Sequence, residues 1–283
     1  MFAQLVDIFK LRIGVLMAIT ALAGFAVTPG KSLSSLEVLV LALSVLGASA
    51  AAGAFNQYAE RDLDARMART RSRPFVTGAA SHNKSWLWLI AALLLISVGM
   101  ACWMFNFASG FHVFMGAFVY GVVYTLWLKQ RTVWNIVIGG AAGSFAVLAG
   151  AAAADPSLNM PSLLLAAVLF LWTPPHFWAL AIVLHKDYAT AGVPMLPVVK
   201  GDETAAKIIL VNILILVAVS LLPGFYGMGW VYLSGAILGG AYFIYKGVLL
   251  VHDANPKTAI RCFIASLVQL TLLLIAAMID PLL

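Results

Sequence analysis

The chain has 283 residues and a formal net charge of +6, and 63% of its residues are hydrophobic while only 10% are charged. Soluble domains contain about 25% charged residues, so this composition excludes a soluble globular protein and predicts an integral membrane protein. Membrane topology explains the positive charge better than nucleic-acid binding does, and the spacing of the two cysteines fits neither a disulfide framework nor a metal site.

The apolar runs are long and continuous, which favours α-helices over the alternating strands of a closed barrel. We predict an all-α membrane protein in which residues 1–283 form a single transmembrane domain. Nine transmembrane helices are expected, at residues 13–29, 37–58, 86–105, 110–128, 133–153, 161–184, 205–222, 228–246 and 261–279.

The distribution of basic residues supports nine spans. An odd number places the two termini on opposite faces of the membrane. With a cytoplasmic N-terminus and an external C-terminus, every Lys and Arg except Lys31 falls on the cytoplasmic side. This distribution follows the positive-inside rule, and adding or removing one span would destroy it.

The densest group of charged residues follows the second predicted span, at 56–74. Asn56, Glu60 and Asp64 recur at every fourth position. Each step of four residues drifts only about 40° around a helix, so the three side chains share one side if the helix continues past the membrane surface. Such oxygen ligands suit Mg²⁺, which takes one or two carboxylates together with water and substrate phosphates. Asp62 points elsewhere, toward a second cation or a neighbouring arginine.

Basic side chains follow these acids at once, at Arg66, Arg69, Arg71 and Arg73. Guanidinium groups bind phosphate oxygens in pairs of hydrogen bonds. A metal ion together with arginines is what a diphosphate needs in order to bind and to depart as a leaving group. The alternative is a solvated loop whose arginines follow the positive-inside rule and whose acids balance them.

The fourth predicted span ends with a second polar group. Tyr120 and Tyr124 are one helical turn apart, and Lys129 and Arg131 emerge on the cytoplasmic side. The two cations are candidates for phosphate contacts. The same residues also fit an aromatic belt with cations that extend to the membrane interface.

The sixth predicted span carries His176 directly after a pair of prolines, and Asp187 and Tyr188 follow at its cytoplasmic end. Eleven residues are about three turns, so His176 and Asp187 share a helix face with the histidine about 16 Å deeper. An ionisable group within the membrane is by default a functional candidate. A deep polar contact beneath a charged site describes a pocket for an amphiphile. The alternative is a neutral histidine bonded to a carbonyl that the prolines leave free. We favour neither His185 nor His112 for catalysis.

The run Asn-x-x-x-Glu-x-Asp-x-Asp-x-x-Met-x-Arg-Thr-x-x-Arg-Pro at 56–74 resembles the first signature of the UbiA superfamily of intramembrane prenyltransferases, which usually reads Asn-Asp-x-x-Asp-x-x-x-Asp. Its departures resemble the heme O synthase (protoheme IX farnesyltransferase) branch, as do Trp-Thr-Pro-Pro-His-Phe-Trp at 172–178 and Lys-Asp-Tyr-x-x-Ala-Gly-Val-Pro-Met-Leu-Pro at 186–197. The second family motif is commonly Asp-x-x-x-Asp, but here Ala191 stands four residues after Asp187, so one acid is absent.

The resemblance implies transfer of the farnesyl group of farnesyl diphosphate to a vinyl group of heme B, with addition of water, to give heme O and diphosphate. It implies a catalytic Mg²⁺ site made of Asn56, Glu60, Asp64 and Asp187. It implies diphosphate contacts from Arg66, Arg73, Lys129, Arg131 and Tyr188. His176 is the implied heme contact.

The same resemblance implies a central pocket that opens at the cytoplasmic face of a bacterial cytoplasmic (inner) membrane. The expected partners are the lipid bilayer, the two substrates, and a downstream heme A synthase or oxidase assembly, with no nucleic acid. The alternative within the superfamily is prenylation of an aromatic quinone precursor. A transporter is disfavoured because no Asp or Glu lies in the middle of a span.

Overall fold

The computed structural model describes residues 2–283, and all regular secondary structure in that range is helical. Eight helical segments in it are long and apolar enough to cross a membrane. They are α3 (Ser35–Ala59), α6 (Ser85–Met104), α7 (Phe107–Phe118) with the π-helix η1 (Val119–Leu128), α8 (Asn135–Gly139) with α9 (Ala141–Ala154), α10 (Met160–Val183), α13 (Asp202–Leu221) with the 3-10 turn η2 (Leu222–Tyr226), α14 (Trp230–His252), and α15 (Pro256–Ile279) with η3 (Asp280–Leu282).

The first predicted span corresponds to α2 (Leu11–Ala26), which is apolar but has only 16 residues. At 1.5 Å per residue it is about 24 Å long, which is less than the ~30 Å hydrocarbon core of a bilayer. Two later helices are longer than predicted, since α14 continues to His252 and α15 begins at Pro256. In both cases the helix continues past the apolar segment that the sequence predicted to lie in the membrane.

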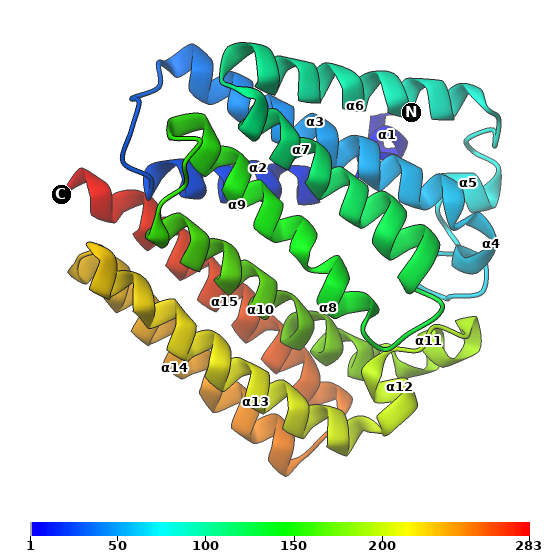
Figure 1. The fold of residues 1–283 in the computed structure, drawn as a ribbon. Helices are drawn as coiled ribbons and strands as arrows, with labels where there is room; N and C mark the ends of the chain where they lie inside the picture. Colours follow the sequence, from blue (N-terminus) through cyan, green and yellow to red (C-terminus); the bar gives the residue numbers. More distant parts are fainter. Residues whose placement is uncertain (1) are drawn as a thin grey trace.

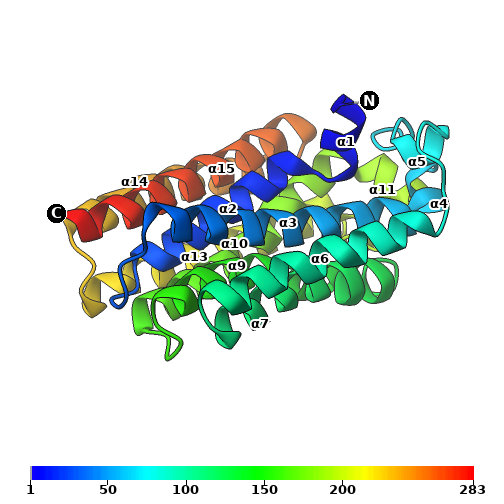
Figure 2. The ribbon, with the colours of Figure 1, turned by 90° about the horizontal axis from the view of Figure 1, so that it is seen from above.

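The long helices follow one another around the bundle. α2 packs on α3 and α9, α10 packs on α9, α13 and α15, and α14 packs on α13 and α15. Contacts between α2 and α15 close the ring. The short helices α1 (Phe2–Ile8), α4 (Arg61–Asp64), α5 (Pro74–Thr77), α11 (His185–Ala191) and α12 (Leu196–Lys200) gather at one end of the bundle, and the C-terminus lies at the other end (Figures 1 and 2).

The outer surface of the bundle is apolar. On α6, the side chains of Trp88, Leu95 and Trp103 are 78%, 72% and 83% exposed. A soluble monomer rarely exposes an apolar surface of this extent, so these side chains face lipid. The chain is a multi-pass integral membrane protein.

Polar caps define where several helices begin. Ser34 and Glu37 form a reciprocal capping box at the start of α3, and Asn106 and Asn159 accept backbone N–H bonds at the starts of α7 and α10. Asn255 caps α15, whose first residue is proline. These caps satisfy N–H groups that the first helical turn leaves without partners.

Two glycines allow α2 and α9 to approach closely. A Cβ atom on Gly24 would lie 2.1 Å from the carbonyl oxygen of Val147, and one on Gly150 would lie 1.7 Å from that of Ala21. Small residues permit such backbone contact between membrane helices. This crossing lies in the second half of α2 and holds that helix against α9.

Candidate active site

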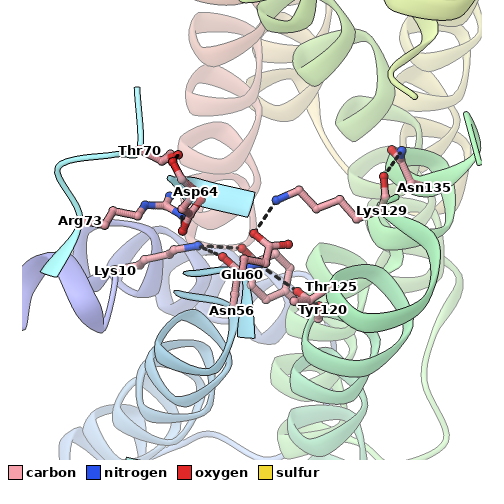
Figure 3. Close-up of polar contacts among 10 residues, drawn as sticks. All are labelled: Lys10, Asn56, Glu60, Asp64, Thr70, Arg73, Tyr120, Thr125, Lys129 and Asn135. Carbon is pink, nitrogen blue, oxygen red and sulfur yellow. Dashed lines mark hydrogen bonds and ion pairs between the residues drawn. The ribbon is translucent and has the colours of Figure 1, made fainter. Parts of the chain in front are cut away.

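A buried polar cluster lies where α3 ends, at the same end of the bundle as α4 and α11. Asn56, Glu60 and Asp64 are 2%, 3% and 1% exposed. α3 ends at Ala59, but the bonds from Glu60 N to Asn56 O (2.9 Å) and from Asp64 N to Glu60 O (2.7 Å) preserve the four-residue spacing into α4. The three predicted side chains therefore lie in one cluster (Figure 3).

Asn56 is held on both sides of its amide. Lys10, between α1 and α2, donates from Nζ to Asn56 Oδ1 at 2.5 Å and to Tyr120 Oη at 3.0 Å. Asn56 Nδ2 donates to Thr125 Oγ1 at 3.0 Å. Burial of the amine, reinforced by the positive charge of Arg73, lowers the pKa of Lys10 to about 7. A basic group from the start of the chain is thus built into the cluster.

Glu60 forms a buried ion pair with the end of the fourth span. Lys129 Nζ lies 2.5 Å from Glu60 Oε2, and the two side chains are 9% and 2% exposed. Asn135 Nδ2 donates to the carbonyl oxygen of Lys129 at 3.2 Å and holds the backbone there. Arg131, only two residues farther along, is exposed on the surface.

Asp64 is bound by the loop that follows it. Arg73 Nη1 lies 2.6 Å from Asp64 Oδ2, and Thr70 Oγ1 donates to the carbonyl oxygen of Asp64 at 2.9 Å. The loop between α4 and α5 therefore folds back over its own first turn. Its remaining cations Arg66, Arg69 and Arg71 are exposed.

The π-helix η1 brings Tyr120 and Thr125, which are five residues apart, to the same side of the helix, where both face the cluster. Thr125 Oγ1 donates to the carbonyl oxygen of Tyr120 at 2.8 Å, and Lys129 N donates to that of Tyr124 at 2.9 Å. The wider turn aligns Tyr120, Thr125 and Lys129 on one side. Segments of π-helix are rare and frequently occur at functional sites.

Two carboxylate oxygens in the cluster have no partner among the described residues. They are Glu60 Oε1 and Asp64 Oδ1, and both are buried. A buried acceptor without a donor is costly and calls for an explanation such as a bound ion. No group of three or more His, Cys, Asp or Glu within residues 2–283 could hold a metal by itself. A cation here would therefore bind to two carboxylates and complete its shell with water and substrate oxygens, as Mg²⁺ does.

Asp187 and Tyr188 lie on α11, at the same end of the bundle as the cluster. Arg69 donates its backbone N–H to Asp187 Oδ2 at 3.1 Å, so the two charged loops touch. A cleft of about 260 Å³ lies at this junction, and its lining includes Arg66, Lys186 and Asp187. Burial raises the pKa of Tyr188, which keeps its hydroxyl protonated as a donor.

His176 lies deeper, on α10 facing α15, and is 7% exposed. Its Nδ1 is 2.6 Å from Ser266 Oγ. The expectation that His176 and Asp187 share a helix face assumed one continuous helix. In the structure the helix is interrupted at Leu184, so His176 lies on α10 and Asp187 on α11. The bonds from Leu184 N to Leu180 O (3.0 Å) and from Tyr188 N to Leu184 O (3.1 Å) continue across the interruption, and the shared face stays a prediction.

Some predicted candidates lie outside the cluster. Asp62 pairs with Arg61 at 3.0 Å on the surface. His185 Nδ1 lies 2.8 Å from Asp202 Oδ1, and His112 lies within α7, on a different helix from His176.

Sequence reasoning missed Lys10 and Thr125 and considered Tyr120 chiefly as part of an aromatic belt. The signal for Lys10 was available, because it stands directly before an apolar helix and so must lie at the membrane surface near the charged loops. Nothing local predicted Thr125, whose role depends on the π-helix.

Comparisons with known proteins show the family to which the chain belongs. A sequence model of the UbiA prenyltransferase family matches residues 17–273. Two curated proteins of Paramagnetospirillum magneticum are similar to the chain. One, named protoheme IX farnesyltransferase 2, is 56% identical, with 99% of this chain and 97% of the relative covered. The other, named protoheme IX farnesyltransferase 1, is 45% identical, with 99% and 98% covered.

The fold is also similar to solved structures. A digeranylgeranylglyceryl phosphate synthase superposes with a TM-score of 0.82 at 18% identity, covering 99% of this chain and 98% of that one. A UbiA homologue from Archaeoglobus fulgidus, bound to DMAPP and Mg²⁺, superposes with a TM-score of 0.72 at 16% identity, covering 95% and 99%. The chain therefore belongs to the UbiA prenyltransferase family of integral membrane enzymes.

Proposed function

We propose that this chain transfers the farnesyl group of farnesyl diphosphate to a vinyl group of heme B, with addition of water, and so produces heme O and diphosphate. The observation that carries the proposal is the 56% identity, over 99% of this chain, to a relative named protoheme IX farnesyltransferase. The buried cluster of acids and bases supplies the groups that an ionising diphosphate requires.

The cluster fits a divalent cation. Glu60 Oε1 and Asp64 Oδ1 are the buried oxygens without partners, and they are the strongest candidates to hold Mg²⁺. Asn56 and Asp187 complete the proposed site. Each already accepts one hydrogen bond, Asn56 from Lys10 and Asp187 from the backbone of Arg69. A UbiA homologue from Archaeoglobus fulgidus, with 16% identity, is bound to Mg²⁺ and DMAPP. When bound, the cation supplies charge neutralisation of the leaving diphosphate.

The basic side chains around the cluster bind the diphosphate. Arg73 and Lys129 lie inside it, where low dielectric strengthens their attraction for phosphate oxygens. Arg66 lines the cleft at the junction of the two loops, Tyr188 lies on the neighbouring α11, and Arg131 lies on the surface. Together they hold the diphosphate still while the bond between its oxygen and the farnesyl C1 breaks.

The bond electrons leave with the diphosphate, and C1 becomes an allylic cation. The terminal carbon of a heme vinyl group forms the new C–C bond. Water then adds to the carbon next to the porphyrin as hydroxide, and its proton passes to solvent. The chain's part is to exclude other nucleophiles and to face the cation with aromatic rings, which attract positive charge.

We place heme contact at His176. Its ring lies within the membrane region, deeper than the diphosphate cluster, where an apolar porphyrin would be accommodated. A buried histidine with a free nitrogen is a common ligand for iron. The fixed ring would orient the reacting vinyl toward C1.

In this proposal α2 crosses the membrane with the eight longer helices, giving nine spans and one domain with a central pocket. All Lys and Arg except Lys31 then face the cytoplasm, where the pocket opens. The N-terminus is cytoplasmic and the C-terminus external, in a bacterial cytoplasmic (inner) membrane. Heme O passes to a downstream heme A synthase or oxidase assembly.

Product analysis by mass spectrometry tests the function. Purified protein receives farnesyl diphosphate, Mg²⁺ and either heme B or an aromatic quinone precursor. We expect a farnesylated hydroxyethyl heme from the first mixture only, and none from the Asp64→Ala variant. A prenylated quinone precursor, with heme B unchanged, would overturn the proposal in favour of its alternative. Wild-type turnover by Asp64→Ala would overturn the metal assignment.

A further inference from the structure

The ring of His176 is clamped between two aromatic rings. Trp172 stacks on one face with centroids 4.1 Å apart and planes 22° apart, and Phe263 stacks on the other at 4.4 Å and 27°. The ring plane is therefore fixed, and only the edges carrying the nitrogens remain for polar contacts. This arrangement couples α10 to α15.

Ser266, on α15, meets the Nδ1 edge of that ring. Its side chain is fully buried, and its Oγ lies 2.6 Å from His176 Nδ1 and 2.6 Å from the carbonyl oxygen of Phe263. Each contact needs a hydrogen atom. A carbonyl carries none and a serine hydroxyl carries one, so the serine donates to Phe263 and the histidine must donate to the serine.

The protonation of His176 follows. The surroundings are apolar and hold no carboxylate in hydrogen-bond contact with the ring, so the imidazole is neutral. A neutral imidazole has one proton, and hydrogen-bond counting puts it on Nδ1. Nε2 therefore carries the lone pair, and it has no hydrogen-bond partner among the described residues.

A second bond keeps Ser266 in place. Trp172 donates from Nε1 to the carbonyl oxygen of Ser266 at 2.8 Å. The same tryptophan thus stacks on the histidine and holds the backbone of the residue that orients it. Such a network in a dry interior has one satisfied arrangement of hydrogens.

We propose that Ser266 is the positioning residue that holds His176 in the Nδ1-protonated tautomer, which leaves Nε2 free to bind the iron of the heme substrate. Metal-binding histidines generally donate their other ring N–H to an acceptor that fixes tautomer and orientation. The inference rests on the proposed function, since it needs heme in the pocket. Without Ser266 Oγ, the Nδ1–H would be left without an acceptor and the ring would favour the other tautomer.

The chain offers a matched control for this serine. Ser220, on α13, is equally buried, and its Oγ donates to the carbonyl oxygen three residues earlier, at Val217 (2.8 Å). Its own carbonyl accepts a bond from Tyr232 Oη at 2.9 Å. Ser220 thus reproduces the local bonds of Ser266 but has no histidine partner.

Heme titration in detergent separates the two serines. Ferric heme B is added to wild type, Ser266→Ala, Ser220→Ala and His176→Ala, and the absorption spectrum is recorded. We expect Ser266→Ala to bind heme about 10–100-fold more weakly, with its spectrum shifted toward that of His176→Ala. Ser220→Ala should match wild type, and Ser266→Thr, which keeps the hydroxyl, should restore the wild-type spectrum. A wild-type spectrum and affinity in Ser266→Ala would overturn the inference.

Nitrogen NMR of ¹⁵N-histidine-labelled wild type tests the tautomer without any change at Ser266. The His176 signals are assigned by their loss in His176→Ala. We expect a protonated Nδ1 and an unprotonated Nε2, and the reverse would overturn the inference. Failure of the proposed function is separate: wild type would then form no heme O at all, whatever the tautomer of its histidine.

Discussion

The buried pair of Lys129 and Glu60 provides a test of how the site balances charge without a metal. Replacing Lys129 by methionine keeps the apolar part of the side chain but leaves Glu60 as an uncompensated carboxylate. Its Oε2 loses a cation at 2.5 Å, and its Oε1 already has no partner. Breaking a buried pair in this way costs about 3–5 kcal/mol of folding free energy.

Thermal unfolding in detergent measures the loss. At roughly 2–4 °C per kcal/mol, Lys129→Met should lower the midpoint by about 6–20 °C in the presence of a chelator. Saturating Mg²⁺ should restore part of this loss, because a cation at Glu60 replaces the missing ammonium. Lys84→Met, which removes an exposed lysine outside the site, should change the midpoint little.

The double variant Glu60→Gln with Lys129→Met removes both charges. It should recover most of the stability lost in Lys129→Met, since a coupled pair is not additive, but it should remain inactive. An equal loss in Lys129→Met and Lys84→Met would refute the reasoning. A double variant whose loss of stability equals the sum of the losses in Glu60→Gln alone and Lys129→Met alone would also refute it.

Three further predictions address the metal, the N-terminal lysine and the helix crossing. Removal of divalent cations should abolish product formation in the wild type, and Mg²⁺ should restore it. Product formation that persists at full rate in excess chelator would contradict the assignment of Glu60 and Asp64. Lys10→Met should lower turnover, because Asn56 and Tyr120 lose a shared donor, while Lys31→Met, at the other end of the bundle, should turn over like wild type. Equal turnover in the two variants would remove Lys10 from the site. Gly150→Ala should destabilise by about 1–3 kcal/mol because its Cβ would collide with Ala21. Gly99→Ala, which meets nothing within 4 Å, should be neutral or slightly stabilising. Thermal unfolding of Gly150→Ala and Gly99→Ala measures the difference, and equal midpoints would show that the crossing of α2 and α9 tolerates a methyl group.

The parts of the structure that sequence reasoning reached are those governed by local rules. Hydropathy located the membrane helices, and the four-residue spacing of Asn56, Glu60 and Asp64 anticipated their common cluster. The spacing survives even though α3 ends at Ala59, because the backbone bonds continue into α4. Sequence patterns predicted the structure correctly where it depends on hydrogen bonds between residues four apart in the chain.

The contacts that complete the site connect distant parts of the chain and had no local signal. Lys10 reaches Tyr120 across 110 positions, and His176 reaches Ser266 across 90. The π-helix that aligns Tyr120 with Thr125 shifts the period of the fourth span, which an ordinary helical wheel does not represent. The wheel comparison of His176 with Asp187 likewise did not include the interruption at Leu184, which places the two residues on different helices.

The arrangement of partners around the acids explains how metal and substrate would bind at a site whose two carboxylates are already paired with basic side chains. Three basic side chains, Lys10, Lys129 and Arg73, surround the two buried carboxylates of Glu60 and Asp64. Each carboxylate uses one oxygen for a basic partner and leaves the other free. A divalent cation can occupy the free oxygens without first breaking an ion pair. Its charge would weaken the attraction of each acid for its base, and Lys129 and Arg73 would then be free to bind the diphosphate. Binding of metal and diphosphate should therefore each strengthen the other, as linkage requires. Isothermal titration of diphosphate with and without Mg²⁺ measures this coupling, and equal affinities would show that the basic residues are not shared.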